Sequence, residues 1–204
     1  MHFWKPVEWS SRGEGLLRLG KAYAEERGLS SRINWIAGDA HYLRLEDARF
    51  DLVLLHTLLS HVRDPAPVLA EAACVLKPSG TLVIFEGDYA TLTYGTDDPE
   101  YGERMDQKII QAMITNPRIM RSAPRLLHRL GLKLVWWRCQ VFNEIGKADF
   151  FLASLNSYLV VLPGAGVASR EEMEAFVGDQ MRASDAGAFF GGYNFVTYIC
   201  EPDL

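Results

Sequence analysis

The stretch that decides the fold runs from Ile33 to Asp88 and contains three apolar runs: INWIAGDA (33–40), FDLVLLHTLL (50–59) and TLVIFEGD (81–88). Continuous apolar runs of this length are typical of strands that are covered on both faces, as in a parallel sheet. Asp64-Pro65 follows the second run, and proline in the first turn favours a helix start. The stretch therefore predicts consecutive parallel βαβ units.

Turn and breaker residues place the helices around these strands. A helix is expected over 14–27, where apolar residues recur at helical spacing until Gly28. A second helix is expected over 66–76, ending at the sequence Lys77-Pro78-Ser79-Gly80, which predicts a tight turn into the next strand. This alternation of strands and helices is that of a Rossmann-like α/β sheet with flanking helices.

The rest of the chain predicts further helices and a mixed edge to the sheet. Helices are expected at 97–116, 119–131, 147–162 and 169–183, and strands at 132–142 and 195–202. We interpret residues 1–204 as a single domain. The helical insertions at about 97–116 and 147–183 would form a lid or a substrate or dimer region, so a homodimer is possible.

Composition limits the classes of partner. The chain has 204 residues and a formal net charge of -5, and it has no lysine- and arginine-rich run, which argues against a nucleic-acid partner. No apolar run is long enough to span a bilayer and no signal peptide is evident, so we expect a cytoplasmic protein without a membrane partner. Cys74, Cys139 and Cys200 are far apart, which predicts reduced, mostly buried thiols and no metal site.

Several polar residues follow the predicted strands, where open α/β sheets bind their ligands. Asp39 follows the first strand and could accept a hydrogen bond from an adenine amino group, or it could cap the next turn. His56 lies just past the next strand end, and His61 follows in the loop. Each histidine could face the ligand crevice, or it could be a structural histidine. For His61 we favour the structural role.

Candidate groups also lie after the strand at 81–88 and before the helix at 119–131. Glu86, Asp88 and Tyr89 could act on a substrate, although loop capping explains the two carboxylates equally well. Arg118 and Arg121 could hold an acidic substrate group, although exposed arginines are usually just solvated. Aromatic and methionine side chains in the helical insertions suit an apolar pocket, but a core more so.

The order of motifs resembles a known family. GDA (38–40), FDLV (50–53), L-x-HV-x-DP (59–65), E-x-x-x-VLKPxG (71–80) and LVIFE (82–86) together are similar to the class I S-adenosylmethionine-dependent methyltransferases of the methyltransferase type 11 branch. This branch includes the ubiquinone- and menaquinone-biosynthesis enzymes. Cys74 and Ser79 depart from the residues that the family often has at those positions.

The resemblance implies a fold, a cofactor and a reaction. It implies a seven-stranded sheet in the order 3-2-1-4-5-7-6 with strand 7 antiparallel, S-adenosylmethionine as cofactor, and methyl transfer to a small organic molecule. Asp39 and Ala40 match the positions that hold the adenine, and His56 matches the position that lies along the cofactor. His56, His61 and Asp88 are the catalytic candidates.

One element of the family pattern is missing. The sequence has no glycine-rich turn of the form E/D-x-G-x-G-x-G, which lets backbone approach the amino-acid part of the cofactor. Glu8 is a candidate for the acidic residue at the end of strand 2 that binds the ribose, or it is a surface residue. The apolar segment from His2 to Trp9 could fill the slot of strand 1, or another chain could supply that pairing.

Three interpretations follow from this departure. The chain could be an N-terminally truncated methyltransferase that still acts on a small molecule. It could be a non-catalytic, methyltransferase-like binding or dimerisation protein. It could also be a truncated gene product whose start lies upstream and whose cofactor binding is impaired.

Overall fold

The computed structural model describes residues 7–11 and 14–203. The strands are β1 (Val7–Ser11), β2 (Ile33–Ala37), β3 (Phe50–His56), β4 (Leu76–Tyr94), β5 (Leu132–Gly146) and β6 (Phe189–Pro202). The helices are α1 (Glu14–Glu26), α2 (Pro65–Val75), α3 (Pro99–Met113), α4 (Ile119–Arg129), α5 (Phe151–Gly164) and α6 (Arg170–Asp185). A short 3-10 turn, Ser30–Arg32, precedes β2.

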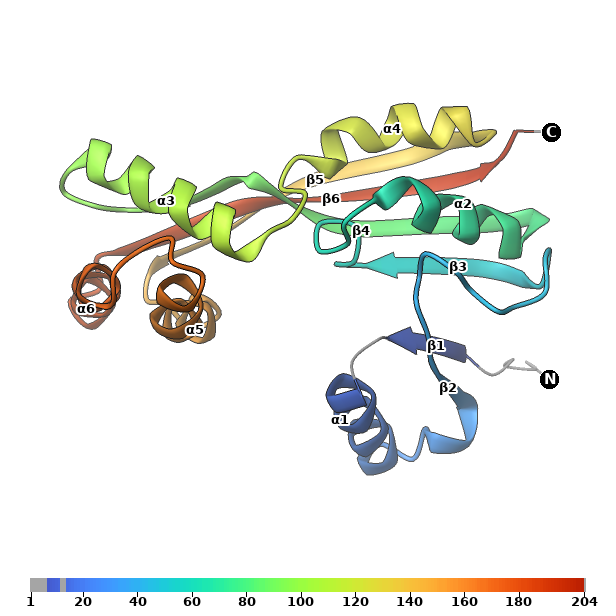
Figure 1. Cartoon of the computed structure of the whole chain (residues 1–204), viewed down its shortest axis with the longest axis horizontal. Helices are drawn as coiled ribbons and strands as arrows, with labels where there is room; N and C mark the ends of the chain where they lie inside the picture. The colour runs from blue at the N-terminus through green and yellow to red at the C-terminus, as the bar shows by residue number, and fades with distance from the viewer. Residues whose placement is uncertain (1–6, 12–13, 204) are drawn as a thin grey trace.

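The strands form two sheets that follow the expected family order (Figure 1). β1 pairs with β2 in parallel, and the four-stranded sheet has the order β3-β4-β6-β5. β3 is parallel to β4, whereas β6 is antiparallel to both β4 and β5. β2-β1 and β3-β4-β6-β5 therefore match strands 3-2 and 4-5-7-6 of the family sheet. Among the described residues no strand lies between β1 and β3.

The expectation that His2 to Trp9 fill the slot of strand 1 is wrong for the part that the structure describes. Val7 pairs with Ile33 and Ser11 with Ala37, so β1 stands where the family has strand 2. A strand in the slot would also hydrogen-bond to β3, and β1 belongs to a separate sheet. Residues 2–6 lie outside the described residues.

Helices α2 and α4 cover one face of the four-stranded sheet. Their buried residues recur every three or four positions, so each helix turns one apolar face to the strands. These side chains meet Leu55 of β3, Leu82 and Ile84 of β4 and Cys200 of β6. We call this cluster the sheet core; its helix residues are Val68, Leu69, Ala72, Ile119, Met120 and Leu127.

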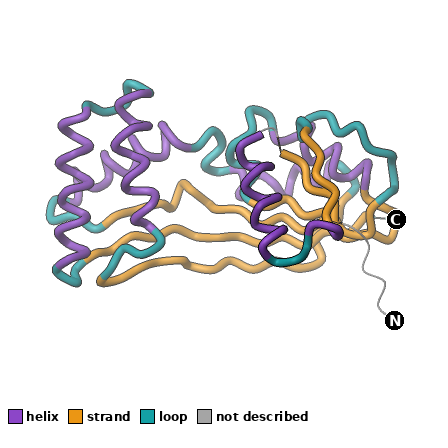
Figure 2. Tube along the Cα trace, turned by 90° about the horizontal axis from the view of Figure 1, so that it is seen from below, coloured by secondary structure: helices purple, strands orange, loops and turns teal. Residues whose placement is uncertain are grey.

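A second core lies at the far end of the long strands, where α3, α5 and α6 gather. Figure 2 shows the strands running along the molecule, with helices standing across them at one end. Tyr94 at the end of β4 makes edge-to-face ring contacts with Phe151 of α5 and Phe176 of α6. We call this cluster the helical-lobe core; it also includes Met105, Ile109, Leu155, Met173 and Phe189.

Three strands are longer than the apolar runs predict. β4 continues from Asp88 to Tyr94, β5 extends to Gly146, and β6 begins at Phe189. β4 and β6 resume their pairing at Thr93↔Gly192 after a register shift, and β5 and β6 stay paired to Gly146↔Phe189. The side chains of these extensions form part of the helical-lobe core, where helices α3, α5 and α6 pack against them.

Two further expectations concern the turn at 77–80 and the cysteines, and the structure differs from both. The predicted turn at 77–80 lies inside β4, between Phe50↔Leu76 and Leu52↔Thr81, where the register shifts. The expectation of mostly buried thiols is wrong, because Cys74 and Cys139 are exposed and Cys200 alone is buried. Cys74 lies on a helix of the outer layer and Cys139 on the edge strand β5, so water reaches both.

The face of β3 that is turned away from α2 and α4 carries exposed apolar residues. Leu52 is 59% and Leu54 is 55% exposed, although both belong to the apolar run that predicts a fully covered strand. On the opposite edge strand, Trp136 is 45% exposed. In the described part of the chain, no helix is long and apolar enough to cross a membrane.

Candidate functional site

The carboxyl end of β2 carries the first predicted site residues. Asp39 follows β2, and its Oδ1 accepts a hydrogen bond from the backbone N–H of His41 at 3.0 Å. The same oxygen lies 2.7 Å from Nδ1 of His41, and the Asp39 side chain keeps 34% exposure. Ala40 packs against the sheet core. Asp39 is thus held in a local turn with its carboxylate partly open to solvent.

The carboxyl end of β3 carries His56 beside a row of aromatic rings. The exposed His56 ring lies 5.0 Å from the ring of Phe85 on β4, its direct cross-strand partner. Phe85 stacks on Phe195 of β6 at 4.8 Å. His56 Nδ1 lies 3.1 Å from Oγ1 of Thr57, whose φ of 45° turns the chain sharply at the strand end.

His61 contacts the same row of rings at the end opposite to His56. Its ring centroid lies 6.0 Å from that of Tyr89, which stacks on Tyr193 at 5.2 Å, and Tyr193 lies 4.8 Å from Phe195. Burial, with the nearby charge of Glu86 as a smaller cause, raises the pKa of Tyr89 to about 12. The Tyr89 hydroxyl therefore stays protonated at neutral pH and does not act as a base there.

Glu86 is a fully buried carboxylate with its hydrogen bonds satisfied. Ser60 donates to it twice, from its backbone N–H at 3.1 Å and from its hydroxyl at 3.0 Å, and the N–H of Gly87 donates at 3.1 Å. Ser60 is also fully buried. These bonds hold the loop after His56 against β4. Because Glu86 is buried, it positions this loop and does not contact a solvent-exposed ligand.

Asp88 is held by an arginine of α4. Arg121 Nε donates to both carboxylate oxygens, at 3.1 and 2.9 Å, and its Nη2 lies 2.9 Å from Oδ2. The Asp88 side chain is 11% exposed and that of Arg121 is 42% exposed. A fork of this kind positions both groups, and it ties α4 to β4.

The three catalytic candidates do not lie on one face of the sheet. His56 pairs with Phe85, and side chains alternate along a strand, so Glu86 and Asp88 point to the opposite side, toward α2 and α4. His61 contacts Tyr89 and belongs with His56. The structure thus groups His56 and His61 around the aromatic row and places Asp88 on the helix-covered face.

Glu8 lies in β1, opposite Asn34 of β2. Its side chain is outside the part of the structure that is described.

Sequence reasoning missed Ser60, which stands at a variable position of the motif L-x-HV-x-DP and becomes notable only through its hydrogen bonds to Glu86. It also missed the partner of Asp88, because Arg121 follows it by 33 residues.

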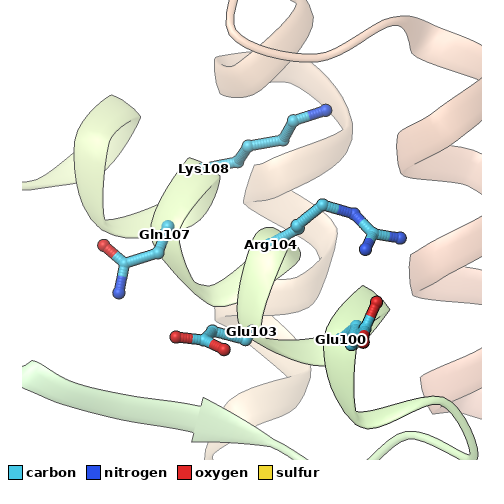
Figure 3. Close-up of a pocket in the computed structure, with 5 residues that line it drawn as sticks. All are labelled: Glu100, Glu103, Arg104, Gln107 and Lys108. Carbon is cyan, nitrogen blue, oxygen red and sulfur yellow. The ribbon is translucent and has the colours of Figure 1, made fainter.

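Two surface depressions are candidates for ligand sites. One, of about 410 Å³, lies on α3 and is lined by Glu100, Glu103, Arg104, Gln107 and Lys108. Figure 3 shows these side chains pointing in different directions rather than converging, and Lys108 is bound to Glu172 at 2.6 and 2.7 Å. The other depression, of about 590 Å³, lies where α2 and α4 begin. Among the described residues, no group of three metal-ligating side chains gathers.

Comparison with known proteins finds similar methyltransferases. Residues 13–84 match the model of the methyltransferase domain family. The demethylmenaquinone methyltransferase of Renibacterium salmoninarum is 35% identical over 153 residues, which are 72% of this chain and 60% of that protein. The chain is similar to the class I S-adenosylmethionine-dependent methyltransferases. It spans 60% of that relative's length and 22% to 38% of several others.

Solved structures share this methyltransferase fold. A Bacillus halodurans protein assigned as a methyltransferase superposes with a TM-score of 0.66 at 15% identity, over 96% of this chain and 82% of that one. A geranyl diphosphate methyltransferase solved with S-adenosylmethionine gives a TM-score of 0.54 at 15% identity, over 97% of this chain and 69% of that one. The expected Rossmann-like α/β fold is confirmed.

Proposed function

We propose that this chain carries out S-adenosylmethionine-dependent methyl transfer to a small organic molecule. One observation carries the proposal: the described strands run in the methyltransferase order, Asp39 and Ala40 follow β2, and His56 is the last residue of β3. In doubly wound sheets this end holds the ligand. The family, and the cofactor in the solved neighbour, support the same choice.

The residues present fit one end of this cofactor. The partly exposed Asp39 carboxylate is suited to accept a hydrogen bond from an adenine amino group, and the half-buried Ala40 next to it has only a methyl side chain. The amino-acid end is not matched, because the sequence lacks the glycine-rich turn. Glu8 is the candidate for the ribose hydroxyls, from a strand that lies beside β2.

The chain's own residues would act mainly by positioning. When bound, the cofactor supplies an electrophilic methyl group, and holding the acceptor in line with it is the larger part of catalysis. His56 and His61 flank an aromatic row that could orient an apolar acceptor, and either imidazole could take its proton. Asp88 and Glu86 act as positioning residues through Arg121 and Ser60.

Calorimetry with the cofactor tests the proposal. We expect S-adenosylmethionine and S-adenosylhomocysteine to bind with a dissociation constant of about micromolar. Asp39→Ala should abolish this binding, while Asp47→Ala, an exposed aspartate in the same loop, should leave it unchanged. An absence of binding at millimolar cofactor would sink cofactor use by this chain alone.

A second candidate is a non-catalytic binding or dimerisation protein. The observation that favours it is the outer edge of β3, with which no strand of residues 7–11 and 14–203 except β4 pairs, together with the exposure of Leu52 and Leu54 on one face of β3. Unpaired strand edges are templates for pairing with another chain. Light scattering separates the two ideas: a stable dimer that binds no cofactor supports this candidate, and a monomer that binds cofactor contradicts it.

A further inference from the structure

The depression between α2 and α4 is lined by an unusual number of arginines. It lies where both helices begin and has a volume of about 590 Å³. Arg118, Arg121 and Arg125 line it, spaced so that all three lie along one side of α4. The rest of the lining combines the polar residues Thr115, Asn116 and Ser122 with Asp64 and with apolar residues of α2, α4 and the segment before α4. This concentration of positive charge stands out in a chain whose net charge is -5.

Two of these guanidinium groups have no acidic partner in the described chain. Arg121 is engaged by Asp88, whereas no ion pair or hydrogen bond of the Arg118 or Arg125 side chain is found among residues 7–11 and 14–203. Asp64 is the one acidic residue in the lining, and its Oδ1 accepts from the N–H of Ala66 at the start of α2. Arg118 and Arg125 therefore keep their donors for a ligand.

We propose that this pocket binds a phosphate or diphosphate group. A guanidinium presents two parallel N–H donors that match the oxygens of a phosphate, and two such groups favour a multiply charged oxyanion over a single carboxylate. Arg118 and Arg125 would each bind the group, with Arg121 between them held in place by Asp88.

The pocket adjoins the loop that follows His56. Asn116, in the pocket wall, donates its backbone N–H to the carbonyl of Ser60 at 2.8 Å and its side-chain amide to the carbonyl of Val62. We assign the phosphate to the head group of the methyl acceptor, because the site is anchored to the same loop as the histidines. That assignment rests on the proposed function, whereas the anion site itself does not.

The experiment measures binding of inorganic pyrophosphate to the full chain by calorimetry. The double variant Arg118→Ser/Arg125→Ser should bind it at least about tenfold more weakly than the wild type. Arg129→Ser is the matched control, since Arg129 is an exposed arginine of α4 outside the pocket lining, and its binding should stay within about twofold. Circular dichroism of the variants checks that they fold.

Phenyl phosphate and phenol separate the sources of the anion. Competition with pyrophosphate by phenyl phosphate, but not by phenol, supports an ester head group. Pyrophosphate binding without any competition by phenyl phosphate overturns the acceptor assignment. Equal affinities of wild type and double variant, or no pyrophosphate binding at all, overturn the site. S-adenosylhomocysteine binding, measured on the same samples, reports on the proposed function separately.

Discussion

Buried carboxylates in this chain differ in how they are compensated. Glu86 accepts three hydrogen bonds and Asp88 is clamped by Arg121. Asp106 of α3, in the helical lobe, is 7% exposed and accepts from the N–H of Tyr94 at 3.1 Å, and within the described ranges its carboxylate forms no ion pair. Burial raises the pKa of Asp106 to about 6, and hydrogen bonds from Thr93 and Tyr94 only partly offset this.

The raised pKa predicts a pH-dependent stability. Because the folded chain holds the Asp106 proton up to about pH 6 and the unfolded chain releases it near the usual pKa of 3.8, the contribution of Asp106 to the free energy of unfolding falls as pH rises through that window. Asp106→Asn keeps an acceptor for Tyr94 and removes the ionisation. We expect the variant to unfold with about 1–3 kcal/mol more free energy than wild type at pH 8, allowing for screening.

Urea denaturation at pH 4.5 and pH 8 measures this difference. The two proteins should differ less at the lower pH, and Asp97→Asn, on an exposed neighbouring residue, should track the wild type at both. A variant that is no more stable than wild type at pH 8 would contradict the assignment of the burial cost to Asp106.

At the scale of elements, α3 begins with a complete side-chain cap. Asp98 Oδ1 accepts from the N–H groups of Glu100 and Tyr101 at 3.0 and 3.2 Å, and Pro99 occupies the first turn. Asp98→Ala should lower the free energy of unfolding by about 1 kcal/mol, because two backbone donors lose their acceptor. Asp97→Ala, one residue earlier, serves as the control and should have little effect. Equal losses in the two variants would show that the cap contributes nothing.

The two sides of α4 have different surroundings. One side of it packs Ile119, Met120 and Leu127 into the sheet core, while the other side carries the arginines of the proposed anion pocket. Arg121 joins the two sides through Asp88 of β4. A ligand bound at the arginines would thus be held on an element that is fixed to the central strand.

At the scale of the whole molecule, two cores share the same strands. β4 and β6 run through the sheet core and the helical-lobe core, so we expect the two cores to unfold together. Leu69→Ala and Met105→Ala each empty a fully buried position, one in each core. Each should lower the free energy of unfolding by about 2–5 kcal/mol.

Coincident denaturation curves test this coupling. Far-UV circular dichroism and the near-UV signal of the helical-lobe tyrosines should give one midpoint in wild type and in both variants. Leu19→Ala, at a position that is 65% exposed, should shift the midpoint little. Separate midpoints for the two signals, above all in Met105→Ala, would show that the lobe is an independent unit.

The sequence alone was enough to place the parallel strands at β2, β3 and the first part of β4, the approximate starts of α2 and α3, and the resemblance to the methyltransferases. These are local signals, because strand and helix periodicity, proline and capping residues act over a few neighbouring positions. The Asp39, Ala40, His56 and Glu8 roles came with the resemblance and stay predictions, as does the division into one domain with a lid.

Only the tertiary structure decided which residues meet. The bond between Ser60 and Glu86 spans 26 positions, and that between Asp88 and Arg121 spans 33. The tertiary structure places β1 beside β2 instead of β3. It also separates Asp88 from His56 across the sheet and gathers three arginines at one pocket. Such contacts depend on the order of the strands in the sheet and on which face each helix covers. Both are set by packing over the whole chain rather than by any local pattern.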